Sequence, residues 1–181
     1  MPRSLASILA CAALFFAACS HTAPGAVSEP AQQVVGTWRL TEFWDRASST
    51  APIVYRFGRI PCGYIVYTPT GHMSAQIATT PIARNLPSDS TREGSPVDAR
   101  EASEMLRRHV SYFGTYRVDM RRGVIIHRVE ADMNRRYAGR DEERPFRLRD
   151  DSLVLGNDST WRRVLVRERG TASPNPACAY R

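Results

Sequence analysis

The segment from Cys62 to Gln76, CGYIVYTPTGHMSAQ, constrains the fold of this chain more than any other. Its first half is rich in aromatic and β-branched residues, which suit a pleated, half-buried strand. Pro-Thr-Gly at 69–71 is a turn sequence, because Pro presets φ and Gly permits positive φ. Residues 72–79 then alternate between apolar and polar side chains, as in a strand with one buried face. The segment therefore predicts a β-hairpin with strands over 64–68 and 72–79.

The same hairpin carries a resemblance to a known family. The lipocalin-like domain proteins of bacteria and fungi share a hairpin motif, Gly-Tyr-x-x-Tyr-Thr-Pro-x-Gly-x-Met-Ser-Ala. This chain resembles them, because it matches every fixed position of the motif from Gly63 to Ala75. The resemblance extends over residues 35–169. It implies an all-β fold, an antiparallel up-and-down lipocalin-like β-barrel, and it implies a small molecule bound inside the barrel without naming one.

The pattern outside the hairpin fits a barrel, because many short apolar segments are separated by polar turns. We expect strands at 36–40, 53–57, 116–119, 124–130, 145–149, 152–155 and 161–168. Ser95-Pro96-Val97-Asp98 is a helix start, and apolar residues from Ala102 to Phe113 follow helical spacing. An inserted α-helix at about 96–112 is therefore predicted, packed across the barrel as a lid or plug.

The N-terminal segment has the features of an exported protein. Arg3 precedes an apolar run from Leu5 to Ala18, which has the length of a signal peptide and is too short for a permanent membrane span. The run ends in Phe-Ala-Ala-Cys, which resembles the bacterial lipobox, so we expect residues 1–18 to be a signal peptide and Cys19 to be lipidated. An ordinary secretory signal is the alternative.

The predicted location follows from that leader. A lipid-anchored protein would lie at the periplasmic face of the bacterial cell envelope, and Ser20 favours the outer membrane. Residues 19–34 are small and polar, which predicts a flexible tether. Residues 170–181 form a C-terminal tail. With Cys11 and Cys19 assigned to the leader and the anchor, Cys62 and Cys178 remain and predict one disulfide.

The charge of the chain is strongly positive, with a formal net charge of +7, and all 25 basic residues are arginine. This composition suits a nucleic-acid or phosphate binder, but it is also what a GC-rich genome produces. Because an exported protein rarely meets nucleic acid, we expect no nucleic-acid partner. The expected partners are a small hydrophobic or amphipathic molecule and a membrane, reached through the lipid anchor.

Common enzyme motifs are missing from the sequence: Gly-x-Ser-x-Gly, His-Glu-x-x-His, a phosphate loop and Gly-x-Gly-x-x-Gly. We therefore expect no cofactor and no metal, and we assign no catalytic residue. The one candidate acid or base is His127, which shares an inward strand face with Ile125 and Val129. A buried histidine more often only satisfies a hydrogen bond.

A second inward polar residue is Arg144, in phase with Phe146 and Leu148. A buried arginine needs a partner, because an unpaired charge in the core is very costly. Glu42 and Glu130 are the internal candidates, and a carboxylate or phosphate of a ligand is the alternative. The predicted ligand contacts are Tyr67, His127, Arg144, Phe146, Trp44 and Glu130.

The resemblance also assigns the closure of the barrel. In lipocalins a Trp near the start of the first strand closes one end, and an Arg at the end of the last strand stacks over it. The matching residues here are Trp38 and Arg169.

Three functions remain open from the sequence. The leading one is an envelope lipoprotein whose barrel binds a small apolar or amphipathic ligand. The alternatives are an enzyme of the isomerase, cyclase or hydratase type acting on a small apolar substrate, and a surface-acting envelope protein with a filled barrel. A filled barrel favours the last. Convergence of a histidine, an arginine and a carboxylate in a cavity favours the enzyme, and a cavity without it favours the binder.

Overall fold

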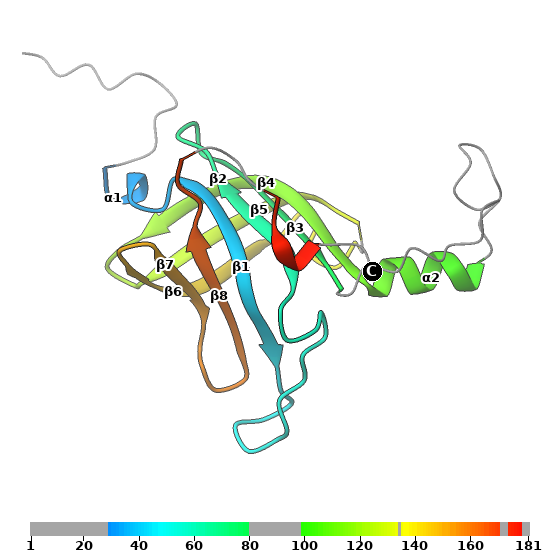
Figure 1. Ribbon diagram of the computed structural model, residues 1–181. Helices are drawn as coiled ribbons and strands as arrows, with labels where there is room; N and C mark the ends of the chain where they lie inside the picture. The colour runs from blue at the N-terminus through cyan, green and yellow to red at the C-terminus, as the bar shows by residue number, and fades with distance from the viewer. Residues whose placement is uncertain (1–28, 80–98, 134, 171–173, 179–181) are drawn as a thin grey trace, which may run out of the picture.

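The computed structural model describes residues 29–79, 99–133, 135–170 and 174–178. Eight antiparallel strands follow one another around a closed barrel, and β8 pairs back with β1 (Figure 1). The predicted up-and-down lipocalin-like barrel is therefore confirmed. The strands are β1 (Gly36–Asp45), β2 (Cys62–Tyr67), β3 (His72–Ala78), β4 (His109–Asp119), β5 (Val124–Asp132), β6 (Asp141–Arg149), β7 (Ser152–Gly156) and β8 (Trp161–Arg167).

The hairpin of β2 and β3 forms where the sequence predicts it. The strands pair from Cys62 with Ala78 to Tyr67 with Met73. Gly71 has a φ of 83°, the left-handed conformation that the tight turn requires and that glycine adopts without strain. On the inward face of this hairpin the side chains are buried, and the polar residues between them face outward.

One end of the barrel is sealed by the chain that leads into β1. A short helix, α1 (Glu29–Gln32), lies at this end, opposite the long connection from β1 to β2 (Figure 1). Val34 is fully buried in the core, and its carbonyl oxygen accepts a hydrogen bond of 2.8 Å from the Trp38 indole. We call this the sealed end. Because Ala31 and Val34 are buried, the predicted tether over 19–34 does not continue to residue 34. Residues 1–28, with the predicted signal peptide and Cys19, lie outside the described residues.

The arginine that stacks on Trp38 is Arg167, so the prediction of Arg169 is wrong. The guanidinium carbon of Arg167 lies 4.1 Å from the Trp38 ring centroid, and its Nη2 donates to the carbonyl oxygen of Gln33 at 2.6 Å. The register explains the difference, because Arg167 is the direct cross-strand partner of Trp38. Arg169 follows the end of β8 and instead pairs with Asp151 at the surface.

The predicted helix over 96–112 is found in part: residues 109–112 belong to β4, and residues 96–98 lie outside the described residues. The helix α2 (Ala99–Arg107) ends two residues before β4, and β4 pairs with the whole length of β3. Opposite the step from Phe113 to Gly114, β5 carries one extra residue, Glu130, in a β-bulge, and a side chain at 114 would collide with the carbonyl oxygen of Arg128. Figure 1 shows α2 projecting away from the barrel, so it is neither a lid nor a plug.

The connection from β1 to β2, residues 46–61, is a loop and not the predicted strand over 53–57. Val54 makes one isolated bridge to Asp45. Phe57 is fully buried and packs edge-on against Phe43, with ring centroids 4.6 Å apart. One aromatic anchor therefore fixes this loop beside the end of the barrel.

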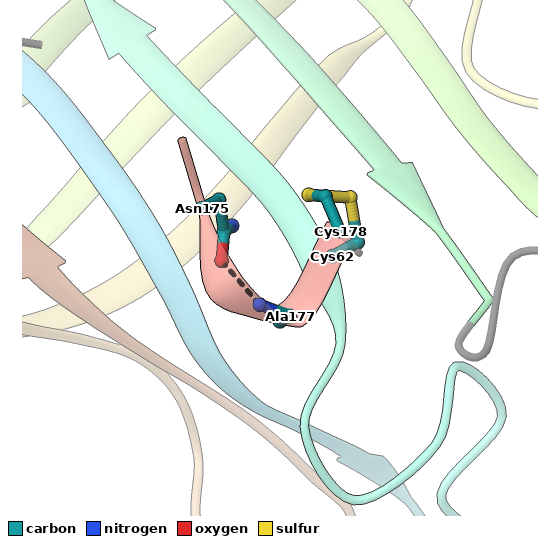
Figure 2. Close-up of a disulfide and its surroundings, with 4 residues drawn as sticks. All are labelled: Cys62, Asn175, Ala177 and Cys178. Atoms are coloured by element: carbon teal, nitrogen blue, oxygen red, sulfur yellow. Dashed lines mark hydrogen bonds between the residues drawn. A yellow bond between two sulfur atoms is a disulfide. The ribbon is translucent and has the colours of Figure 1, made fainter. Parts of the chain in front are cut away.

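The predicted disulfide between Cys62 and Cys178 is confirmed (Figure 2). It joins the first residue of β2 to a 3₁₀ turn, η1 (Pro176–Cys178), that packs on the outside of β2. Asn175 supports the turn, since its Oδ1 accepts a hydrogen bond of 3.0 Å from the Ala177 amide. The C-terminal tail is thereby fastened to the end of the barrel opposite α1.

Candidate functional site

A cavity of about 350 Å³ lies inside the barrel at the end opposite α1. Its walls come from seven strands, β1 to β4 and β6 to β8, and from the loops that the up-and-down barrel brings to this end. We call this the open end. The described lining residues are Phe43, Asp45, Arg46, Arg56, Ile65, Ile77, Val110, Tyr112, Arg136, Tyr137, Arg144, Leu155, Thr160, Trp161 and Arg163.

The bulge in β1 decides which acid enters this cavity. The register shifts between Leu40 and Glu42, so the inward phase that begins at Trp38 passes to Phe43 and Asp45. Glu42 faces the other side, where its carboxylate lies 3.8 Å from Arg162. Glu42 is therefore not the partner of Arg144, and Asp45 is the carboxylate that lines the cavity.

Arg163 is an arginine whose donors are occupied by the protein. Its Nη2 donates to Asp45 Oδ1 at 2.7 Å, and its Nη1 donates to the carbonyl oxygens of Trp44 and Arg162. Its guanidinium also stacks on Phe43, 3.3 Å from the ring centroid. Burial lowers the pKa of Arg163 from its ordinary value, and the charge of Asp45 opposes that shift. Arg163 is thus fixed in one position in the cavity wall.

Arg144 is held much less tightly. Its side chain is 18% exposed, and its Nη2 lies 3.4 Å from Glu142 Oε2. A charge-assisted hydrogen bond is shorter, about 2.7–2.9 Å. The guanidinium carbon lies 5.6 Å from the ring centroids of both Tyr137 and Trp161. The aromatic rings keep the cation in the cavity without occupying its donors.

A buried polar network lies beneath the cavity. The ring of His127 is hydrogen-bonded on both nitrogens, from Nε2 to the Tyr67 hydroxyl at 2.8 Å and from Nδ1 to the Tyr112 hydroxyl at 3.1 Å. Burial lowers the pKa of His127 to about 3, and the charge of Arg144 acts in the same direction. The imidazole is therefore neutral at physiological pH.

The two tyrosines of this network differ in what they face. Burial raises the pKa of Tyr67 well above its ordinary value, and Tyr67 does not line the cavity. Burial also raises the pKa of Tyr112, while the charge of Arg144 and a hydrogen bond from it oppose that shift. Tyr112 does line the cavity, so it presents the network to a ligand.

The structure separates the six predicted ligand contacts. Arg144 lines the cavity. Tyr67 and His127 lie beneath it, fully buried, and Phe146 packs against the core. Two lie elsewhere: Trp44 is buried on the strand face opposite the lining residues Phe43 and Asp45, and Glu130 is exposed outside the barrel.

Sequence reasoning missed Arg163 and Asp45. Arg163 has a signal in the sequence, because it lies two residues before Leu165 and so shares its inward face. The signal for Asp45 is the break in alternation at Thr41 and Glu42, two consecutive polar residues at the position of the bulge that turns Asp45 inward.

Other kinds of site are not found in the described part of the chain. Its His, Cys, Asp and Glu residues form no group of three that would hold a metal ion. None of its helices is long and apolar enough to cross a membrane.

Comparison with known proteins places the chain in a family. The family model for the lipocalin-like domain matches residues 35–170, which covers most of the chain and all eight strands. No curated protein and no solved structure matches the chain significantly. The motif between Gly63 and Ala75, the barrel and the family match agree, and the chain belongs to the family of lipocalin-like domain proteins.

Proposed function

We propose that this protein binds a small amphipathic molecule in the cavity at the open end of its barrel. The observation that carries the proposal is the cavity itself, which combines an apolar wall at Ile65, Ile77 and Leu155 with charged, hydroxyl and aromatic side chains along the rest of its lining. Small-molecule sites are cavities of roughly 300–1,000 Å³ that combine apolar surface with polar groups that orient the ligand. A lipocalin-like barrel indicates ligand binding in general, and an internal cavity speaks against a barrel filled by its own side chains.

The geometry gives less support to an enzyme. His127 is the candidate acid or base, but it does not line the cavity and both of its ring nitrogens are engaged by tyrosines. A proton-transfer group must come within hydrogen-bond reach of its substrate. Binding without chemistry is the function that these positions support best.

The test is a titration with N-phenyl-1-naphthylamine, a neutral dye that fluoresces in apolar surroundings. We expect saturable binding of one dye per barrel. Val110→Trp should abolish binding by filling the cavity, and Phe113→Trp is the matched control, because Phe113 lies on the same strand and is exposed. Equal binding by both variants, or no binding by the wild type, would reject the proposal.

We further propose that the protein is anchored in the bacterial cell envelope through Cys19. The Phe-Ala-Ala-Cys sequence supports this, and so does the disulfide, since disulfides persist in oxidising compartments such as the periplasm. Cys19→Ser should move the protein from the membrane fraction to the soluble periplasmic fraction. Identical fractionation of wild type and Cys19→Ser would contradict the anchor.

A further inference from the structure

We propose that the ligand carries an anionic head group, a carboxylate or a phosphate, and that Arg144 and the hydroxyl of Tyr112 bind it. This inference rests on the proposed function and specifies its ligand. Arg144 and Tyr112 both line the cavity, and the apolar wall at Ile65, Ile77 and Leu155 would take the tail of the molecule.

The first support is the charge of the cavity. Five arginines line it, Arg46, Arg56, Arg136, Arg144 and Arg163, and Asp45 is the one carboxylate among the described lining residues. Glu142 adds a second acid beside Arg144. The cationic excess raises the local concentration of anions and penalises cations.

The second support is the contrast between the two arginines that lie deepest among aromatic rings. Arg163 already donates to Asp45 and to two backbone carbonyls, so it has little left for a ligand. Arg144 has its carboxylate neighbour at 3.4 Å and rings on two sides. A partly desolvated cation gains from a closer anion, because charge-assisted hydrogen bonds are among the strongest in proteins.

The third support is the proton arrangement beneath the cavity. Among the described residues, the Tyr67 hydroxyl has one hydrogen-bond partner, His127 Nε2. A buried hydroxyl that cannot donate is costly, so Tyr67 donates to Nε2. The neutral imidazole then carries its hydrogen on Nδ1 and donates it to the Tyr112 oxygen.

This arrangement leaves the hydroxyl hydrogen of Tyr112 free to point into the cavity. In the opposite tautomer His127 carries its hydrogen on Nε2. The Tyr112 hydroxyl would then donate to Nδ1, and the Tyr67 hydroxyl would have no acceptor in the core. His127 is therefore a positioning residue, which fixes Tyr112 as a donor beside Arg144. A guanidinium and a hydroxyl donor side by side suit an anionic oxygen.

Four probes with the same alkyl chain separate this inference from the proposed function: decanoate, decyl phosphate, decanol and decyltrimethylammonium, each measured by isothermal titration calorimetry. We expect one of the two anions to bind at least about tenfold more tightly than decanol, and the cation most weakly. The preferred anion tells a carboxylate from a phosphate. Decanol binding as tightly as both anions would overturn the inference and leave the proposed function standing. Binding of none of the four would overturn both.

Variants assign the head-group site. Arg144→Met should weaken binding of the preferred anion about tenfold and leave decanol binding unchanged, and Arg144→Lys should restore part of the loss. Arg136→Met is the control, because Arg136 also lines the cavity but lies outside the proposed pair. An equal loss of anion affinity in Arg144→Met and Arg136→Met would overturn the assignment of the head group to Arg144. It would show instead that the positive charge of the whole cavity attracts the anion.

The role of His127 has its own readout, the ¹⁵N spectrum of its ring. We expect the Nδ1–H tautomer in the wild type and, in Tyr112→Phe, a severalfold weaker anion affinity together with a lower thermal stability, because the buried Nδ1–H loses its acceptor. Tyr137→Phe, a change of the same kind in the cavity wall, should keep full affinity. An Nε2–H tautomer in the wild type would overturn the assignment of Tyr112 as donor.

Discussion

Each end of the barrel holds a tryptophan beside an arginine, and the two pairs differ in what surrounds them. At the sealed end Arg167 lies 4.1 Å from the Trp38 ring and donates to backbone carbonyls of the entering chain. At the open end Arg144 lies 5.6 Å from the Trp161 ring, with a carboxylate at 3.4 Å and a cavity beside it. The same two residue types therefore close one end and leave the other available to a ligand.

The difference teaches how to tell an arginine that stabilises the fold from one that can bind a ligand. The guanidinium N–H groups of the first already donate to acceptors of the protein, and those of the second are less fully engaged. Arg167 lies at the surface of a sealed core, yet its hydrogen bonds end on carbonyls that cannot leave. Arg144 is equally shielded from solvent, but its partners are rings, a distant acid and the hydroxyl of Tyr112 in the cavity wall. Burial alone would rank the two alike.

The largest expected effect comes from removing each tryptophan in turn. Trp38→Ala should lower the free energy of unfolding by about 3–5 kcal/mol, because a fully buried ring leaves a cavity and an unpaired Val34 carbonyl. Trp161→Ala should cost much less, because its half-buried ring borders an existing cavity. Urea unfolding of both variants measures the difference, and equal losses would break the comparison of the two ends.

The network between the two ends predicts a dependence of stability on pH. The pKa of His127 is about 3 in the folded protein against 6.5 for the free side chain. Between these values the unfolded chain binds the proton and the folded protein does not, so stability falls as the pH drops from 6.5 toward 3. At a pH of about 4.5 the loss should be about 2–3 kcal/mol.

The matched variant for this effect is His127→Gln, which keeps an amide donor and acceptor but does not titrate. Its unfolding free energy should be lower at neutral pH and should fall less between about pH 6.5 and 4.5 than that of the wild type. Parallel pH profiles for the two proteins would show that His127 is not buried in its neutral form.

Much of this architecture was predictable from local signals. Alternation and turn residues identified the hairpin of β2 and β3, and two leftover cysteines identified the disulfide. The inward phases of Tyr67, His127 and Arg144 also followed from alternation, because the one bulge in these strands, in β5, lies beyond Val129 and leaves the phase of His127 unchanged.

The errors share a different physical cause, which is non-local pairing. The apolar residues from 110 to 113 fit a helix, and only pairing with β3 makes them a strand. The bulge in β1 changes the face of every residue that follows it, which moved Asp45 into the cavity and Glu42 out of it. The stacking of Arg167 on Trp38 depends on the register between β1 and β8, and no local pattern contains that register.

A smaller effect is expected from the disulfide at the open end. The bond closes a separation of 116 residues in the unfolded chain, but in the folded protein it restrains only a tail of about ten residues after β8. The loop closed in the unfolded chain is about ten times longer than the tail restrained in the folded protein, which is between three and four doublings of length. Each doubling costs about 0.6 kcal/mol of loop-closure entropy, so the disulfide should stabilise the fold by about 2 kcal/mol. Unfolding of the Cys62→Ser/Cys178→Ser double variant measures it, with an intact barrel in the circular dichroism spectrum as control. A loss of less than a tenth of the total stability would contradict the bond.

The smallest effect in this series tests which arginine closes the barrel. Arg167→Met should cost about 1–2 kcal/mol, through lost stacking on Trp38 and lost hydrogen bonds to the chain before β1. Arg169→Met should leave the unfolding midpoint unchanged, since Arg169 is exposed and its ion pair with Asp151 lies at the surface. Thermal unfolding compares the two, and a larger shift for Arg169→Met would reverse the assignment.

The division between a structural end and a binding end is tested most directly by methyl NMR during a titration with decanoate. Ile65 and Ile77 line the cavity, whereas Val34 is fully buried at the sealed end. The methyl resonances of Ile65 and Ile77 should shift progressively to saturation, and those of Val34 should stay in place. Shifts of equal size at Val34, or no shift at Ile65 and Ile77, would contradict binding at the open end.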